Sequence, residues 1–133
     1  MASRVVIKLG GGLITDKSSM KKFDSEAVER VAETISSVIE IGIPTIIVHG
    51  AGSFGHLLAK EWSISGGLDQ KIAEGQRMVI DQIRTDMREL NGLVMDKFAD
   101  LKIESEGLPP SNWAIGTGSV SYTHLTLPTN REV

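Results

Sequence analysis

Small residues and two histidines share one short stretch of the chain, residues 48–56, with the sequence VHGAGSFGH. An apolar, β-branched run at residues 45–48 leads into it and is typical of a buried strand, and a helical segment is expected at residues 54–62. Where a strand passes into a helix through residues without bulk, unpaired backbone N–H groups and the positive end of the helix dipole lie together. Such a turn binds anions. His49 and His56 stand at its two ends and can add hydrogen bonds.

Another glycine run follows the first expected strand. The apolar residues 5–9 contain one charged side chain, Lys8, and end at Gly10, Gly11 and Gly12. Their unbroken apolar character predicts a parallel strand that is covered on both faces. A lysine in such a strand is costly to bury unless it meets an anion, and the alternative is an edge position with the ammonium in water.

The segment between these glycine runs predicts a helix. Residues 13–22 contain Thr15, Asp16, Lys17 and two serines and are expected to form an exposed loop. Asp24 is a suitable N-cap for a helix that extends to about Ile41, and Gly42 and Pro44 end it. Spacings of three and four predict one buried face, formed by Val28, Val31, Ala32, Ile35, Val38 and Ile39. Strand, helix and strand in this length predict a βαβ unit with a right-handed crossover.

A long helix is expected further along the chain. Residues 63–70 are rich in glycine and predict a loop, whereas residues 72–101 are mostly helical, with Asn91 and Gly92 as a dividing point. The apolar stripe of this helix consists of Ile72, Met78 or Val79, Ile83, Met87, Leu90, Val94 and Phe98. Residues 111–115 are a candidate for a third strand.

Composition limits the classes of protein that this chain can represent. Its 133 residues, 41% hydrophobic and 23% charged, are enough for one domain with a core. The net charge of −3 argues against a general nucleic-acid binder. Cysteine is absent, which excludes disulfides and thiolate metal sites and fits a reducing cytoplasm. We also expect no signal peptide and no membrane span.

The stretch GAGSFG at residues 50–55 also satisfies the pattern G-x-G-x-x-G of dinucleotide-binding sites. Such a site requires an acidic residue after a second strand, about twenty positions further on. Asp69 has a suitable spacing but follows no predicted strand. The stretch also lacks the Gly-Lys-Ser/Thr ending of a Walker A loop. The glycine pattern alone is therefore weak support for NAD binding.

Both glycine runs together give a better account. In a parallel sheet they would lie at the same carboxyl edge, where open α/β sheets bind their ligands. With Lys8 and Lys17 nearby, two facing backbone cradles could hold two phosphate groups in line. Phosphoryl transfer requires little beyond such positioning and charge neutralisation.

These stretches, IKLGGGLITDK at residues 7–17 and VHGAGSFGH at residues 48–56, resemble the amino acid kinase superfamily, and within it the isopentenyl phosphate kinases. The resemblance covers essentially all of residues 4–110. It implies an α/β fold, a three-layer α/β/α sandwich with a mostly parallel sheet, of which residues 1–119 would be the N-terminal, acceptor-binding part. It also implies transfer of the ATP γ-phosphate, with Mg²⁺, to isopentenyl phosphate in the cytoplasm. No nucleic-acid or membrane partner is implied, and a homodimer is allowed.

The resemblance implies a role for individual residues by position. Lys8 would contact the ATP phosphates, Lys17 would stabilise the transferring phosphoryl group, and His56 would hydrogen-bond the acceptor phosphate. Backbone contacts to the phosphates of ATP and acceptor would come from Gly11, Gly12, Gly50, Ala51 and Gly52. No metal ligand is implied in this part of the chain.

The chemistry of the implied acceptor is consistent with these residues. A phosphate monoester has a second pKa of about 6, so its attacking oxygen is already ionised at neutral pH and no general base is required. His56 would then orient the acceptor and, as imidazolium, offset its charge. His49, closer to the strand, is expected to be a packed structural histidine. By the same resemblance, Met78, Val79 and Ile83 are candidates to line a pocket for the prenyl tail.

Residues 120–133 resemble the translated read-through of a sequencing adapter, and we expect them to be a non-native tail. The native part would then stop near Ser119, and the chain by itself would be weakly active or inactive. Other functions remain open at this point: a related kinase that acts on a small carboxylate, phosphate or phosphonate, an NAD-binding Rossmann domain, or a non-catalytic remnant.

Overall fold

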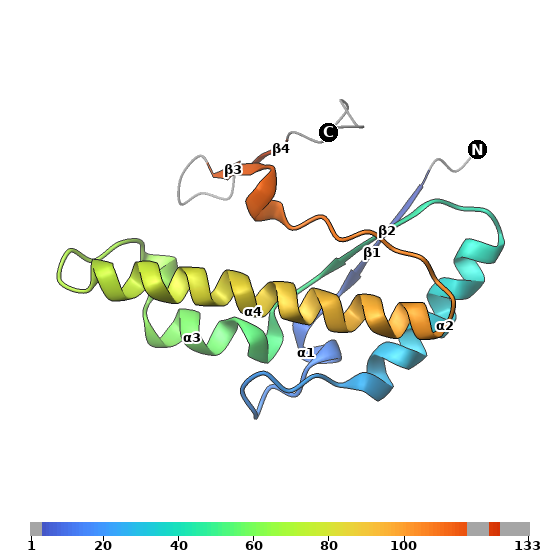
Figure 1. Cartoon of the computed structure of the whole chain (residues 1–133), viewed down its shortest axis with the longest axis horizontal. Helices are drawn as coiled ribbons and strands as arrows, with labels where there is room; N and C mark the ends of the chain where they lie inside the picture. The colour runs from blue at the N-terminus through green and yellow to red at the C-terminus, as the bar shows by residue number, and fades with distance from the viewer. Residues whose placement is uncertain (1–3, 117–122, 126–133) are drawn as a thin grey trace.

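A computed structural model of the chain describes residues 4–116 and 123–125 (Figure 1). In chain order its elements are the strand β1 (Val5–Leu9), the helices α1 (Gly11–Ile14) and α2 (Ser25–Glu40), the strand β2 (Thr45–His49), the 3₁₀ turn η1 (Gly52–Phe54), the helix α3 (His56–Glu61), the 3₁₀ turn η2 (Ile64–Gly66), the helix α4 (Ala73–Asp100), the 3₁₀ turn η3 (Pro110–Asn112), and the strands β3 (Ala114–Gly116) and β4 (Thr123–Leu125).

The strands β1 and β2 form a parallel pair with α2 as the connection between them, which confirms the predicted βαβ unit. Their register pairs Val5 with Thr45 and Leu9 with His49. One face of this pair lies on the core. The helices α2 and α4 both contribute to this core and pack against each other (Figure 1). The buried core consists of Leu9, Ile14, Val28, Ala32, Ile35, Phe54, Leu90, Val94, Phe98 and Ile103.

The opposite face of the strand pair, which we call the outer face, is open. Its side chains are Val6, Lys8, Ile46 and Val48, and Val6 is 62% exposed. The prediction of strands covered on both faces is therefore wrong for the described part of the chain. Helices pack on one face of the pair only, so the structure supplies two layers of the predicted three-layer sandwich.

The first half of the chain follows its sequence signals closely. The Asp24 carboxylate accepts a hydrogen bond from the Ala27 amide at 3.0 Å, which confirms the N-cap of α2. Gly42, with φ of +89°, ends that helix as predicted. The exposed loop predicted for residues 13–22 is wrong in part, because Ile14 belongs to the short helix α1 and is buried in the core.

The second half departs more from expectation. The predicted division of α4 at Asn91 is wrong, because the Asn91 side chain bonds to His49 and to Met95 Sδ instead of competing for the helix backbone. The helix predicted for residues 54–62 is instead η1 followed by α3. The candidate third strand is realised only as β3, which pairs with β4 and not with β1 or β2. The predicted tail contains β4, and the rest of residues 120–133 lies outside the described residues.

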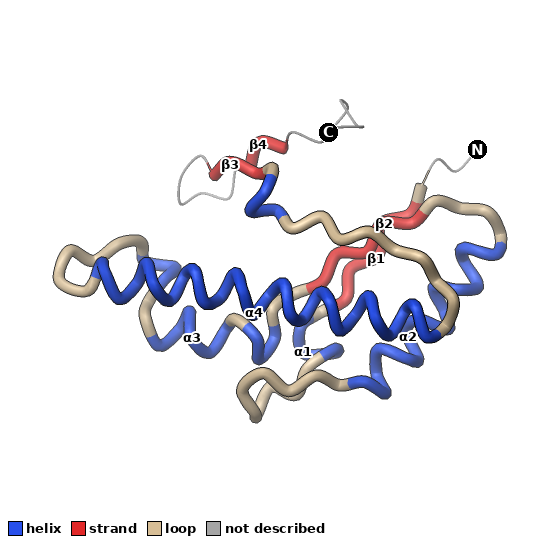
Figure 2. Tube along the Cα trace, viewed as in Figure 1, coloured by secondary structure: helices blue, strands red, loops and turns tan. Residues whose placement is uncertain are grey.

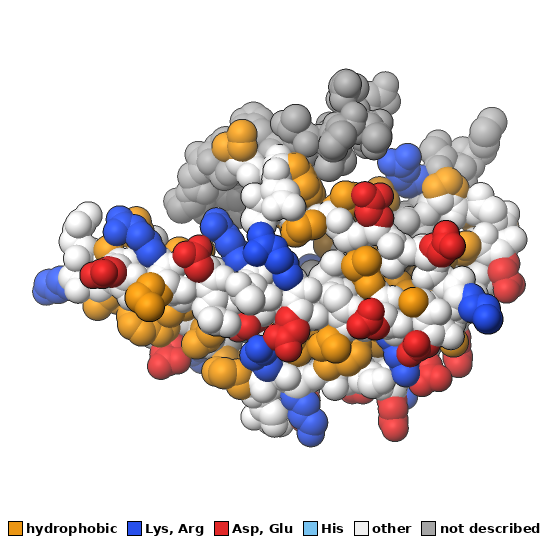
Figure 3. All heavy atoms as spheres, in the orientation of Figure 1, with side chains coloured by type: hydrophobic (Ala, Val, Ile, Leu, Met, Phe, Trp, Pro, Cys, Tyr) orange, Lys and Arg blue, Asp and Glu red, His pale blue; other side chains and the backbone are white. Residues whose placement is uncertain are grey.

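The segment after α4 closes the core. The chain turns at Lys102, with φ of +62°, and runs back past the strands (Figure 2). Ile103 joins the core, and Gly107 lies against Asn91 and Met95. No helix in the described residues is long and apolar enough to cross a membrane. Acidic and basic side chains are interspersed over the face shown in Figure 3.

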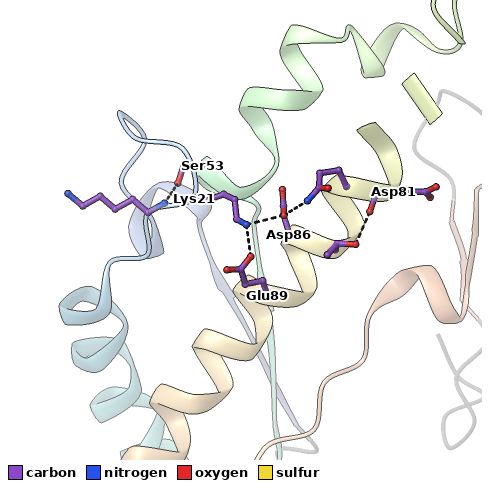
Figure 4. A network of polar contacts seen from close by, with 8 residues as sticks. Lys21, Ser53, Asp81, Asp86 and Glu89 are labelled. Atoms are coloured by element: carbon purple, nitrogen blue, oxygen red, sulfur yellow. Dashed lines mark hydrogen bonds and ion pairs between the residues drawn. The ribbon is translucent and has the colours of Figure 1, made fainter. Parts of the chain in front are cut away.

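The loop between α1 and α2 is fastened to α4 by a network of charges (Figure 4). Lys21 Nζ lies 3.2 Å from Asp86 Oδ1 and 2.6 Å from Glu89 Oε2. Asp86 is only 3% exposed, and its carboxylate also accepts a hydrogen bond from Gln82 Nε2 at 2.9 Å. The two carboxylates raise the pKa of Lys21 above its ordinary 10.5. Asp86 thus enters the interior with its charge matched by this lysine.

We expect Lys21→Met to lower the free energy of unfolding, because it leaves the Asp86 carboxylate buried without its cation. The pKa of Lys21 is raised in the folded chain, so its contribution is complete below pH 10.5 and is lost as pH rises through the raised value. Urea unfolding should therefore give the same difference from wild type at pH 7 and pH 9. The matched control is Asp81→Asn, which removes an exposed pair with Arg84 at 3.8 Å and should change stability much less. Equal stability of wild type and Lys21→Met at pH 7 would contradict this role.

Candidate active site

The two glycine runs, the first at residues 10–12 and the second at residues 50–52, touch each other. Both leave the strand pair at the same edge, and the Gly50 amide donates to the Leu9 carbonyl at 3.0 Å. A Cβ atom on Gly11 would collide with the backbone nitrogen of Gly52, and one on Gly50 would lie 2.8 Å from the nitrogen of Gly11. The two backbones can approach this closely only because neither carries side chains at the contact. The expectation that the two runs face one another is confirmed.

Gly52 is held in a conformation that favours glycine. Its φ is +50°, and a Cβ atom there would collide with Thr15 Oγ1 and lie 2.5 Å from the Gly11 carbonyl oxygen. Thr15 Oγ1 donates to that carbonyl at 2.6 Å and accepts from the Ser53 amide at 3.0 Å. The start of α1 and the start of η1 are therefore joined through one side chain.

Lys17 lies beside the first glycine run. Its side chain passes over Gly12, so a Cβ atom on that glycine would collide with Cε and lie 2.8 Å from Nζ. The preceding Asp16 accepts hydrogen bonds from the Ser18 hydroxyl at 2.6 Å and the Ser18 amide at 2.9 Å, which hold the pKa of Asp16 below its usual range. This turn directs an exposed ammonium group to the place where the amides of α1 are unpaired.

Lys8 lies apart from this arrangement. It is on the outer face of β1, opposite Val48, and is exposed to solvent. The structure thus shows the alternative placement considered for this lysine, with its ammonium in water. The side chain is nevertheless long, and it leaves the strand close to the edge where the first glycine run begins.

The two histidines of the second run have different surroundings. His49 is half-buried, with Nδ1 3.0 Å from the Gly50 carbonyl oxygen and Nε2 3.2 Å from Asn91 Oδ1, so the prediction of a packed structural histidine is confirmed. His56 is exposed and is the first residue of α3. Its ring is therefore available to a ligand.

The residues proposed for a prenyl pocket are only partly brought together. Met78 is 70% exposed and Val79 is half-buried, so Val79 and not Met78 belongs to the apolar stripe of α4. Ile83 and Met87 lie against Gly55, directly before His56. Of the three candidates, Ile83 is the one that the structure places against Gly55.

Several residues that shape this region were missed from sequence. Thr15 was expected in an exposed loop and is 3% exposed, and Asp86 is equally buried. A signal existed for Asp86, because it precedes Leu90, Val94 and Phe98 at intervals of four on the buried side of α4. A charged residue at a core position of a helix indicates a distant partner of opposite charge.

Gln76 is a further buried residue that was missed, and its side chain holds the loop before α4 in place by hydrogen bonds. Its Nε2 donates to the carbonyls of Trp62 at 2.9 Å and Gly67 at 3.3 Å, and its Oε1 accepts from the Asp69 amide at 2.8 Å. Asp69 follows η2 rather than a strand, so it lacks the setting of a ribose-binding acid in a dinucleotide site. Within the described residues, no three acidic or histidine side chains gather to hold a metal ion.

Comparison with known proteins agrees with this geometry. Residues 3–123 match the model of the amino acid kinase family. The isopentenyl phosphate kinase of Thermoplasma acidophilum is 28% identical over 121 residues, which are 91% of this chain and 46% of that protein. The isopentenyl phosphate kinase of Methanothermobacter thermautotrophicus is 29% identical over 92% of this chain and 47% of its own length. The chain thus spans less than half of the relatives it matches.

Solved structures give the same result. An X-ray structure of an isopentenyl phosphate kinase has a TM-score of 0.74 and 30% identity, covering 84% of this chain and 46% of the other. The product complex of the T. acidophilum enzyme has a TM-score of 0.64 and 27% identity, covering 75% and 40%. The strand pair, its crossover helix and the facing glycine runs thus belong to a known α/β fold, and this chain belongs to the amino acid kinase family.

Proposed function

We propose that this chain is the acceptor-binding half of an ATP-dependent kinase that converts isopentenyl phosphate to isopentenyl diphosphate. The observation that carries the proposal is the direct packing of Gly11 against Gly52, which brings two backbone cradles together at one sheet edge. Relatives named isopentenyl phosphate kinase, one of them solved as a substrate complex, support the choice of acceptor. A kinase for another small acceptor is the alternative, and competition between acceptors would separate the two.

Each group near the contact has a place in this proposal. The amides of Gly11 and Gly12 would bind phosphate of ATP, and those of Ala51 and Gly52 would bind phosphate between donor and acceptor. Lys17 would offset the charge that moves with the phosphoryl group. Lys8 would reach ATP phosphates from the end of β1. ATP would bring Mg²⁺, which neutralises phosphate charge.

His56 would donate a hydrogen bond to the acceptor phosphate. Its exposure and its position after Gly55 leave the ring free to turn toward the second glycine run. The acceptor oxygen is ionised near neutral pH, so this histidine orients the acceptor and need not remove a proton. The side chains of Ile83 and Met87, packed on Gly55, would lie on the side from which an apolar tail approaches.

We expect His56→Ala to weaken binding of isopentenyl phosphate by about tenfold or more, because hydrogen bonds to charged groups contribute about 1.5–3 kcal/mol. Isothermal titration of the purified chain with isopentenyl phosphate measures this loss. Lys60→Ala is the matched control, since Lys60 is an exposed cation of the same short helix. If both variants bind as wild type does, His56 does not contact the acceptor.

We also expect the chain alone to bind isopentenyl phosphate but to show little or no turnover with ATP and Mg²⁺. The chain spans 44–47% of its curated relatives, and the outer face of the strands, with Lys8, carries no second helical layer within the described residues. Formation of ADP coupled to loss of isopentenyl phosphate is the assay. Turnover at a rate typical of kinases would show that this part is sufficient for catalysis.

The neighbouring glycines Gly11 and Gly12 provide a matched pair of substitutions. Gly11→Ala should destabilise the chain by about 1–3 kcal/mol, because its methyl group meets the backbone of Gly52. Gly12→Ala should leave stability nearly unchanged, because its methyl group meets only the movable end of Lys17, yet it should displace that ammonium. Urea unfolding and titration with ATP measure the two effects. Equal stability of the two variants would refute the proposed backbone contact.

A further inference from the structure

We propose that Thr15 is a positioning residue whose buried hydroxyl fixes the two glycine runs relative to each other. The meaning of this placement rests on the function proposed above, in which both runs hold phosphate. The hydroxyl lies at the contact itself: Oγ1 donates to the Gly11 carbonyl at 2.6 Å and accepts from the Ser53 amide at 3.0 Å. Among the described hydrogen bonds of side chains, this is the one that links α1 to η1.

The arrangement leaves the hydroxyl little freedom. A hydroxyl has a single proton to donate, and this proton is directed to the Gly11 carbonyl, so the remaining oxygen lone pairs face the Ser53 amide. The bonds then run in one direction, from the Ser53 N–H through Oγ1 to the Gly11 oxygen, and each strengthens the other. Thr15 is 3% exposed, so water cannot easily replace a lost partner.

The consequence for the second glycine run is a fixed peptide plane. Because the Ser53 amide points to Thr15, the peptide between Gly52 and Ser53 is held in one orientation, directly after Gly52 with its φ of +50°. The backbone amides of Ala51 and Gly52, which precede this peptide and would bind phosphate in the proposed function, are thereby held in a set direction. Phosphate binding by backbone amides depends on such orientation, since the donors must converge on one anion.

Through its bond to Ser53, Thr15 also helps to fix the loop that carries Lys17. Ser53 accepts hydrogen bonds from the Lys21 amide at 3.0 Å and, through its hydroxyl, from the Lys22 amide at 3.2 Å. The Asp16 amide donates to the Lys22 carbonyl at 2.8 Å and closes the base of the loop. Thr15 thus lies where the first run, the second run and the Lys17 loop meet, and its hydroxyl sets all three in register.

A purely structural role for Thr15 would reside in its packed methyl group, and two substitutions separate that role from the hydroxyl. Thr15→Val retains the shape and removes both hydrogen bonds, whereas Thr15→Ser retains both bonds and removes the methyl group. Thr85→Val is the matched control. Thr85 Oγ1 donates to the carbonyl four residues earlier, at 3.1 Å, as Thr15 does, but it lies exposed on α4 and joins no second element.

The experiment follows the ¹⁵N-labelled chain by NMR, with hydrogen exchange of the Ser53 amide and titration with isopentenyl phosphate. We expect Thr15→Val to speed exchange of this amide by about tenfold and to weaken isopentenyl phosphate binding by a similar factor, as one lost buried hydrogen bond predicts. Thr15→Ser and Thr85→Val should stay within about twofold of wild type in both readouts. Protection of the Ser53 amide that is unchanged in Thr15→Val would overturn the proposal, as would equal losses in Thr15→Ser.

A measurement on the wild-type chain keeps the proposal open to refutation if Thr15→Val does not fold. The Thr15 hydroxyl proton should exchange slowly enough to be observed and should show a through-space contact with the Ser53 amide, because both are buried and bonded. Absence of this proton would overturn the assignment. Failure of wild type to bind isopentenyl phosphate would instead contradict the proposed function, and the two exchange measurements would still decide whether Thr15 fixes the runs.

Discussion

The contact between two stretches of bare backbone is the constraint on which the rest of this structure depends. Gly11 and Gly52 meet where a single Cβ atom on either would collide with a neighbouring group. Such a contact requires both runs to leave the sheet at the same edge, which the parallel register from Val5 and Thr45 to Leu9 and His49 provides. The helix α2 connects the two strands and packs against α4.

Much of this could be predicted from sequence, because its causes are local. The N-cap at Asp24, the end of α2 at Gly42 and the spacing of apolar residues along α2 all depend on residues that are near one another in sequence. Even the meeting of the glycine runs follows from a general rule for parallel sheets. The burial of Thr15 does not, since it depends on Ser53 in a distant segment. The spacing of Asp86 on α4 indicates its burial but not its partner, Lys21, which also comes from a distant segment. No local pattern specifies which segment will supply them.

The open outer face shows a different limit of sequence reasoning. The unbroken apolar runs of β1 and β2 are typical of strands with helices on both faces, as in the family's α/β fold. In the described residues helices cover one face, and Val6, Ile46 and Val48 are left exposed. The predicted cover on both faces is wrong for the described residues, because hydrophobic periodicity describes the surroundings that a strand suits and not whether this chain supplies them.

The charges around the loop at residues 16–22 support the role proposed for Lys17 as the cation beside a moving phosphoryl group. Lys21 is matched by Asp86 and Glu89, and Lys22 lies 3.6 Å from Asp16. Lys17 forms no ion pair with any described carboxylate, and its side chain rests on Gly12. A paired ammonium would have to leave its carboxylate before it could bind phosphate. By matching the neighbouring lysines, the loop leaves the positive charge of Lys17 directed to the glycine runs, where an anion would gain most from it.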